Sequence, residues 1–387
     1  MESADTDAAQ PRMLVIARES RGMTQGRLAE VMQELDGPGS KVSQGYVSRA
    51  EAGRLAVTGD RLALYAQALG YPVPLLCVGT QEVGAGVGLV HHRKKQAASA
   101  GDLKRIHALL NLTRIQLRAL LASAPKREAT GIPQVAVDEL TTAADAAKQV
   151  RTKWDAAGGP LESVVTMAED LGAWVTCRRL VAPVPLDSGA ESVPVDAVSC
   201  APAGEDPLVL LNSGTPAERQ RFTLAHELGH MVMHQVPHPE QEKQANAFAA
   251  ELLMPRRQIR AELSSGTLSV PRLLDLKARW KVSMWALLRR AHTLGIISDW
   301  QYRTLAVEMS SLGYRTSEPG TFDTETPTAV TSMISQQLDQ GHEIPELASA
   351  AYLSQDEFVN LYLSCPVPPT AGAARRPISS TVSEAAR

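Results

Sequence analysis

One short segment constrains the fold more than any other part of the chain. It reads TPAERQRFTLAHELGH and covers residues 215–230. Thr215 is a candidate N-cap, Pro216 suits the first helical position, and Glu218 would complete a capping box. The sequence therefore predicts a helix that begins here and carries HELGH, residues 226–230, in its interior.

The HELGH segment has the spacing of a zinc site. His226 and His230 lie one turn apart on the same helix face, so both imidazoles can bind a single zinc ion. Glu227 lies beside them, where its carboxylate can take a proton from zinc-bound water, whose pKa zinc lowers to about 7. Gly229 leaves room for a substrate or a second helix to approach closely. We therefore expect a hydrolytic zinc centre with Glu227 as the general base.

A catalytic zinc ion usually has three protein ligands, and the residues leave the third one open. The HExxHxxGxxH pattern would need glycine at 233 and histidine at 236, but the chain has Met233 and Val236. His234 continues the four-residue spacing from His230, as His238 does in turn. Ligands on successive turns of one straight helix cannot close a tetrahedron, so we expect His234 beside the site or at the surface.

The next predicted helix, residues 240–254, offers three carboxylates as the third ligand: Glu240, Glu242 and Glu251. Glu242 and Asn246 share one face of that helix, one turn apart. Glu251 falls on its outer part, where we expect a surface residue.

Patterns around these two helices indicate a small sheet followed by more helices. A helix is expected from about Gly159 to Leu171, and three β-like runs follow at Trp174–Cys177, Val195–Cys200 and Leu208–Asn212. Residues 265–365 look helical. Within them, the helix, turn and helix of residues 273–288 are interpreted as packing elements because Trp280 and Trp285 resemble core anchors.

Five segments, in this order, resemble the ImmA/IrrE metallopeptidase family: GGPLESVVTMAEDLGAWV, VDAVS, VLLNS, ERQRFTLAHELGHMVMH and EKQANAFAAELLMP. The resemblance implies an α+β gluzincin-like domain that hydrolyses peptide bonds, with a repressor or other DNA-binding protein as substrate. It also implies zinc ligands at His226, His230 and Glu242, with Glu227 as the base. The stretch LLDLKARWKVSMWALLRRAHTLGIISDWQY resembles the helical extension that follows this domain.

Residues 11–80 predict a separate bundle of short helices, with Thr24, Ser43 and Thr58 able to cap helix starts. The segments MLVIARESRGMTQGRLAEVM, VSQGYVSRAEAGR and LALYAQALGYP resemble the Cro/repressor-type (XRE) helix-turn-helix domain, a five-helix bundle that binds double-stranded DNA. The expected contacts lie at the start of the second helix and along the third, which would enter the major groove: Gln25, Gln44, Gly45, Tyr46 and Arg49.

The sequence departs from that family at two places that affect how the bundle would dock on DNA. The turn between the second and third helices is longer than usual, and Ala50 and Ala52 replace residues that are often isoleucine and asparagine. A bundle that binds protein rather than DNA is the alternative. Because helix-turn-helix proteins usually read paired half-sites, a homodimer is compatible with the sequence, although no heptad seam is visible.

We thus expect a multi-domain, mostly α protein. Its parts are a helix-turn-helix domain (1–80), a basic linker with helices (81–150), the α+β metallopeptidase domain with a small sheet (151–260), a helical extension (261–365) and a disordered tail (366–387). Residues 93–128 hold nine basic and two acidic side chains, which indicates either a solvated helix face or contacts with DNA phosphates.

Net charge, cysteine content and the absence of targeting segments limit how the protein can bind DNA and where in the cell it can work. The net charge is −3, so DNA binding must come from a local patch. The four cysteines lie far apart, and neither a signal peptide nor an apolar stretch of about 20 residues is visible. We expect a cytoplasmic protein without membrane contacts. Two alternatives remain: a transcription factor whose metallopeptidase-like domain only senses a ligand or metal, and an antitoxin-like binding protein.

Overall fold

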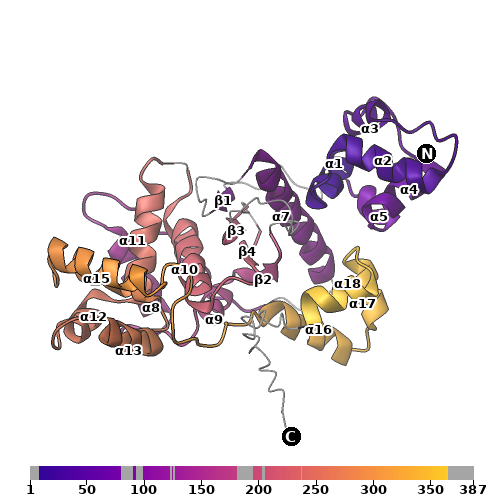
Figure 1. Cartoon of the computed structure of the whole chain (residues 1–387). Helices are drawn as coiled ribbons and strands as arrows, with labels where there is room; N and C mark the ends of the chain where they lie inside the picture. Colours follow the sequence, from indigo (N-terminus) through magenta and orange to yellow (C-terminus); the bar gives the residue numbers. More distant parts are fainter. Residues whose placement is uncertain are drawn as a thin grey trace, which may run out of the picture.

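A computed structural model of the chain describes residues 8–79, 90–92, 99–122, 124, 127–180, 195–202, 205–236 and 238–364. The protein is mostly helical, with one small sheet, a helix-turn-helix bundle at the N-terminus and a helical C-terminal region (Figure 1). This confirms the predicted fold class. Within the described ranges, no helix is both long and apolar enough to cross a bilayer. Residues 81–89 of the expected basic linker and the tail from residue 366 lie outside these ranges.

The N-terminal bundle forms because short amphipathic helices share one apolar core. Thr24 and Ser43 accept hydrogen bonds from the main-chain N–H groups of Arg27 and Tyr46, whereas the side chain of Thr58 caps nothing. In the long turn, the side chain of Gln33 donates to the carbonyl of Val42 over 2.6 Å. The helices are α1 (Pro11–Ser20), α2 (Gln25–Asp36), α3 (Gln44–Glu51), α4 (Gly59–Leu69) and α5 (Val73–Leu76).

Among the described residues, the sheet has four strands in the order β1-β3-β4-β2. Strands β1 and β3 both run antiparallel to their neighbours, while β2 is parallel to β4. Their bounds are β1 (Val90–His92), β2 (Trp174–Arg178), β3 (Ala197–Cys200) and β4 (Leu208–Asn212), so the three predicted runs are strands.

Both faces of the sheet are covered, which explains why its strands read as continuous apolar runs. In β4, Leu208 and Leu210 enter one core, and Val209 and Leu211 enter the other. The core on the Val209 side is the larger and packs the sheet against the metal helix and its neighbours. Its helices are α8 (Ala143–Lys153), α9 (Val164–Asp170), α10 (Ala217–Met233), α11 (Gln241–Leu253), α12 (Arg256–Leu263), α13 (Val270–Trp280), α14 (Met284–Thr293) and α15 (Asp299–Ser311).

Two helix starts differ from the prediction. Helix α9 begins at Val164 because Ser163 caps it. Helix α10 begins at Ala217 with Pro216 as its N-cap, and no side chain caps it. The predicted capping box is therefore wrong, since the Glu218 carboxylate instead accepts from Lys277 Nζ over 2.9 Å.

The prediction for Glu251 is also wrong. This residue is only 4% exposed, and its carboxylate forms an ion pair with Arg290 of α14 and accepts from the main-chain N–H of Arg256. Helix α14 thus covers the face of α11 that the sequence pattern assigned to solvent. The α13–α14 pair itself packs into the core through Trp280, as expected.

Helix α7 (Ala100–Leu121) covers the opposite side of the sheet, together with α16 (Ala329–Asp339), α17 (Ile344–Ala350), α18 (Gln355–Phe358) and a π-helical turn at Val359–Leu363. It also touches the bundle, because Ala108, Leu112 and Ile115 belong to the bundle's core. Figure 1 shows α7 between the sheet and α1.

Two basic residues of α7 serve the fold rather than a solvated face or a phosphate contact. Arg114 forms an ion pair with Glu205 at 2.6 Å, and it is 8% exposed. Arg105 donates to the carbonyls of Ser20 and Leu180, each over 3.1 Å. Half-buried Arg105 thus links the end of α1 to the chain that follows β2.

Candidate metal centre

Three side chains from two helices meet at one point. The Nε2 atoms of His226 and His230 lie 3.1 Å apart on α10. Glu242, in the first turn of α11, places its carboxylate oxygens 3.4 Å from His226 Nε2 and 3.2 Å from His230 Nε2. Both histidines are fully buried, whereas Glu242 is about half exposed. Hydrogen bonding to the two rings lowers the pKa of the Glu242 carboxyl group well below its ordinary value.

These separations suit a tetrahedral zinc ion. Zinc binds imidazole nitrogen and carboxylate oxygen at about 2.0–2.2 Å, which puts tetrahedral ligand atoms about 3.3 Å from one another. The three measured separations, 3.1 to 3.4 Å, match that spacing. One carboxylate and two imidazoles are also a donor set that zinc prefers. The residues present therefore fit the metal.

A hydrogen-bonded chain fixes the orientation of one ligand. His230 Nδ1 lies 3.0 Å from His234 Nδ1, and His234 Nε2 lies 2.8 Å from the side-chain amide oxygen Oε1 of Gln244. Because an amide oxygen only accepts, His234 donates from Nε2 and accepts at Nδ1 from His230. With zinc bound, the Nε2 lone pair of His230 would then be directed at the metal, in place of an Nε2–H that hydrogen-bonds Glu242. Burial lowers the pKa of His234, which favours the neutral ring that this chain requires.

Glu227 points into the protein beside the ligands. It is fully buried, and one carboxylate oxygen accepts from Ser199 Oγ over 2.5 Å. Its other oxygen, Oε1, has no hydrogen-bond partner among the described residues. Ser199 lies on the same face of β3 as Ala197, the face toward α10, and it is a polar residue in an otherwise apolar row.

Gly229 allows the two ligand-bearing helices to approach each other. A Cβ atom at this position would lie 2.9 Å from the Phe248 ring of α11 and 3.3 Å from the Phe248 Cβ. The expectation that Gly229 admits a second helix is thus met, and α11 is that helix. This contact sets how close Glu242 comes to the histidines.

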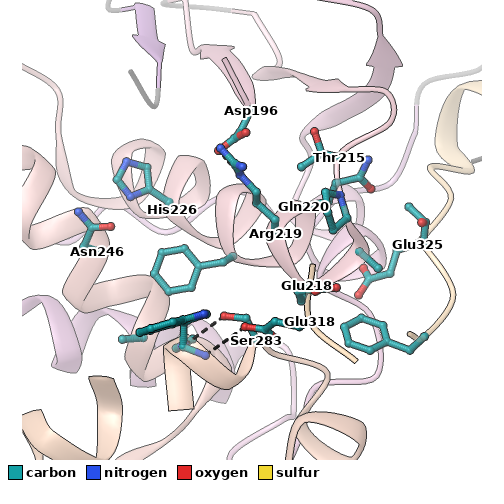
Figure 2. A pocket seen from close by; sticks show the side chains of 18 of the residues that line it. Asp196, Thr215, Glu218, Arg219, Gln220, His226, Asn246, Ser283, Glu318 and Glu325 are labelled. Atoms are coloured by element: carbon teal, nitrogen blue, oxygen red, sulfur yellow. Dashed lines mark hydrogen bonds and ion pairs between the residues drawn. The ribbon is translucent and has the colours of Figure 1, made fainter. Parts of the chain in front are cut away.

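The centre opens into a cleft of about 2080 Å³ that follows α10 from His226 toward Pro216. Figure 2 shows His226 and Asn246 at one end and Glu325 at the other, with Arg219 and Glu218 between them. His226 and Glu242 line the cleft, whereas His230 and Glu227 are not among its lining residues.

The predicted DNA-contacting residues lie together at the start of α2 and along α3. Gln44, Gly45 and Arg49 are exposed, and Tyr46 is half-buried against Tyr65. Gln25 is partly committed elsewhere, because its amide group donates to Glu51 over 2.8 Å. The DNA contacts of these five residues stay predictions.

Sequence reasoning missed two residues of the metal centre, Gln244 and Ser199. Gln244 lies two positions after Glu242, where helical periodicity does not suggest a shared role. Ser199 could have been singled out, since it is the polar member of the buried strand AVSC.

Comparison with known families agrees with this architecture. Residues 14–76 match the model of the helix-turn-helix domain, and residues 184–292 match the model of the IrrE N-terminal-like domain of M78 peptidases. A search of curated proteins found no match. The first matched range contains most of α1 and all of α2 to α5, and the second contains HELGH and Glu242. The chain therefore joins an XRE-type helix-turn-helix domain to an ImmA/IrrE-type, M78 peptidase-like domain.

Proposed function

We propose that this DNA-binding regulator is a zinc-dependent metallo-endopeptidase that cleaves a repressor or another regulatory protein. The observation that carries the proposal is the convergence of His226, His230 and Glu242, within 4.8 Å of one another, at the end of a long cleft. Such a cleft has room for a peptide chain. Operator DNA is the second partner, bound through the helix-turn-helix domain in the cytoplasm.

Each residue has a role that follows from its position. His226, His230 and Glu242 would hold zinc, which supplies a polarised water and stabilises charge on the scissile carbonyl. Glu227 follows His226 in the chain and carries a buried carboxylate oxygen that has no hydrogen-bond partner among the described residues, so it would accept a proton from a zinc-bound water. Ser199 holds the other oxygen and thereby orients the carboxylate. His234 and Gln244 keep the His230 ring in the required tautomer.

The first test is the zinc content of the purified full-length protein. We expect about one zinc per chain, lost in Glu242→Ala and kept in Glu240→Ala. Glu240 is the matched control because it lies just before α11, is exposed and forms an ion pair only with Lys243 among the described residues. If wild type binds no zinc after reconstitution, the peptidase proposal fails.

A second candidate function is metal or ligand sensing without cleavage. It is favoured by one observation: Glu227 is hydrogen-bonded to Ser199 of the sheet and does not line the cleft. Substitution Glu227→Gln separates the two functions. It should abolish regulation in cells if hydrolysis matters, and leave regulation and zinc binding unchanged if the domain only senses. An antitoxin-like role would require a small protein that copurifies in stable stoichiometry.

A further inference from the structure

One extended segment runs along the cleft without belonging to any helix or strand. It connects α15 to α16, and we call residues 318–325 of it the strap. Glu318 starts the strap and Glu325 ends it, and residues 321–324 between them line the cleft.

The strap is fixed at both ends by carboxylates bound at helix N-termini. Glu318 accepts from the first main-chain N–H groups of α14, at Met284 over 2.8 Å and Trp285 over 3.2 Å, and pairs with Lys277 at 2.9 Å. Carboxylates are stabilised at this end of a helix. The strap is therefore held in place at this end.

Glu325 repeats the arrangement at the other end. It accepts from Ser163 Oγ over 2.9 Å and from the main-chain N–H of Val165 over 2.8 Å, at the start of α9, and it pairs with Arg221. With both ends held this way, the strap forms one wall of the cleft.

Between the anchors, the main chain is available for pairing. Residues 318–327 make no main-chain hydrogen bond to another described main-chain group, and these residues form no helix or strand. An extended main chain with unpaired N–H and C=O groups can accept another chain as an added strand.

A few residues of an extended substrate would span the distance between the metal position and the strap. Glu218 precedes His226 by eight residues on α10, which corresponds to about 12 Å at 1.5 Å per residue. Lys277 joins Glu218 to Glu318, each over 2.9 Å, so the strap begins at the level of Glu218. An extended peptide advances about 3.3 Å per residue, and about four residues would therefore separate the metal from the strap.

The charges along the cleft favour an acidic peptide. Asp196, Glu318 and Glu325 are matched by Arg219, Lys277 and Arg221. By contrast, Arg289 and Arg315 both line the cleft, and neither has a carboxylate within ion-pair distance among the described residues. Asp323 also lines the cleft and is exposed, and it has no basic side chain within ion-pair distance among the described residues.

We propose that the strap is a peptide-binding edge. An extended acidic segment pairs its main chain with residues 320–324, about four residues from the metal, and its carboxylates bind Arg289 and Arg315. This inference rests on the proposed function, because it names the substrate class of the same cleft.

Peptide selection tests the charge preference. The probe is a randomised library of ten-residue peptides, incubated with zinc-loaded full-length Glu227→Gln protein and read by mass spectrometry. We expect retained peptides to be enriched several-fold in Asp and Glu. Adding Arg289→Glu should remove this enrichment, whereas Arg257→Glu should not, since Arg257 is exposed on α12 outside the cleft.

A proline substitution tests the main-chain pairing. Thr321→Pro removes one N–H donor, and Thr321→Ala removes the same side chain but keeps that donor. For one retained peptide, we expect Thr321→Pro to weaken binding about 3- to 10-fold relative to Thr321→Ala, as the loss of one hydrogen bond predicts. Equal melting temperatures of the two variants would show that both are folded.

The outcomes separate this inference from the proposed function. Retention without an acidic preference, or equal binding by Thr321→Pro and Thr321→Ala, would overturn the strap proposal. Cleavage of the library by zinc-loaded wild type, unchanged in the strap variants, would leave the peptidase proposal standing alone. Acidic retention without cleavage would support the strap and overturn hydrolysis, and neither retention nor cleavage would overturn both.

Discussion

The helix-turn-helix bundle and the metal centre partner their carboxylates in different ways. In the bundle, Glu51 is paired with Arg18, whose Nε and Nη2 atoms lie 2.5 and 2.9 Å from its two oxygens. In the metal centre, Glu227 and Glu242 meet only a serine and two histidines, and no Lys or Arg of the described chain lies within ion-pair distance.

This difference indicates which site needs a cation from outside. A buried carboxylate is costly unless a positive charge compensates it. The bundle carries that charge in its own sequence, so Glu51 needs no cation from outside. The metal centre gathers negative charge and lone pairs around one point, where a divalent cation would balance them.

The largest effect is expected when the Arg18 guanidinium, the cation that pairs with Glu51 inside the bundle, is removed. Arg18→Ala leaves the Glu51 side chain buried with no cationic partner and only the Gln25 amide as a donor, so we expect the free energy of unfolding to fall by about 3–5 kcal/mol. Urea unfolding of the full chain measures it. Arg27→Ala is the control, because Arg27 pairs with Glu30 at the exposed surface and should cost less than about 1 kcal/mol. Equal losses in both variants would contradict the comparison.

The next largest effect is expected when zinc is added to the metal centre. Zinc at about 1,000 times its dissociation constant should stabilise the folded protein by about 4 kcal/mol. Thermal unfolding with and without zinc measures this shift. Glu242→Ala should lose it, and magnesium should not reproduce it in wild type, because magnesium prefers oxygen ligands. An equal shift in Glu242→Ala would place the zinc elsewhere.

A smaller effect concerns the chain that orients His230. His234→Leu should weaken zinc binding about 10- to 100-fold, since the ring of His230 would lose its acceptor. Competition with a chromophoric chelator measures the affinity. His238→Leu is the matched control, because His238 is exposed and its hydrogen bonds to described residues lie near the start of α11. Unchanged affinity in His234→Leu would show that the tautomer is fixed in another way.

The smallest effects are expected at the exposed DNA-reading helix. Gln44→Ala should cost about 1–3 kcal/mol at one base pair, at the lower end because Gln44 is exposed, and should spare non-specific binding. Arg49→Ala should reduce the slope of log affinity against log salt by about 1. Binding of operator variants at several salt concentrations measures both. A flat salt response in wild type would remove DNA as a partner.

Local patterns predicted much of this structure, and tertiary contacts account for the rest. The strands and the HELGH helix could be predicted because their apolar periodicity is visible in short windows of sequence. Glu242 and Glu251 lie on the same helix, yet only packing reveals that Glu251 meets Arg290, 39 positions later. The pairing of Ser199 with Glu227 and the anchoring of the strap likewise join segments that no short window of sequence contains.

Helix α7 also limits how such a chain can be assembled from parts. Its Ala108, Leu112 and Ile115 complete the core of the DNA-binding bundle, while Ile106, Leu110 and Leu117 complete a core of the sheet. A recombination junction placed just before Ala100 would therefore transfer the bundle without the helix that closes it. The two domains are recognisable separately in sequence, but neither can be exchanged as an independent cassette unless the recipient supplies an equivalent of α7.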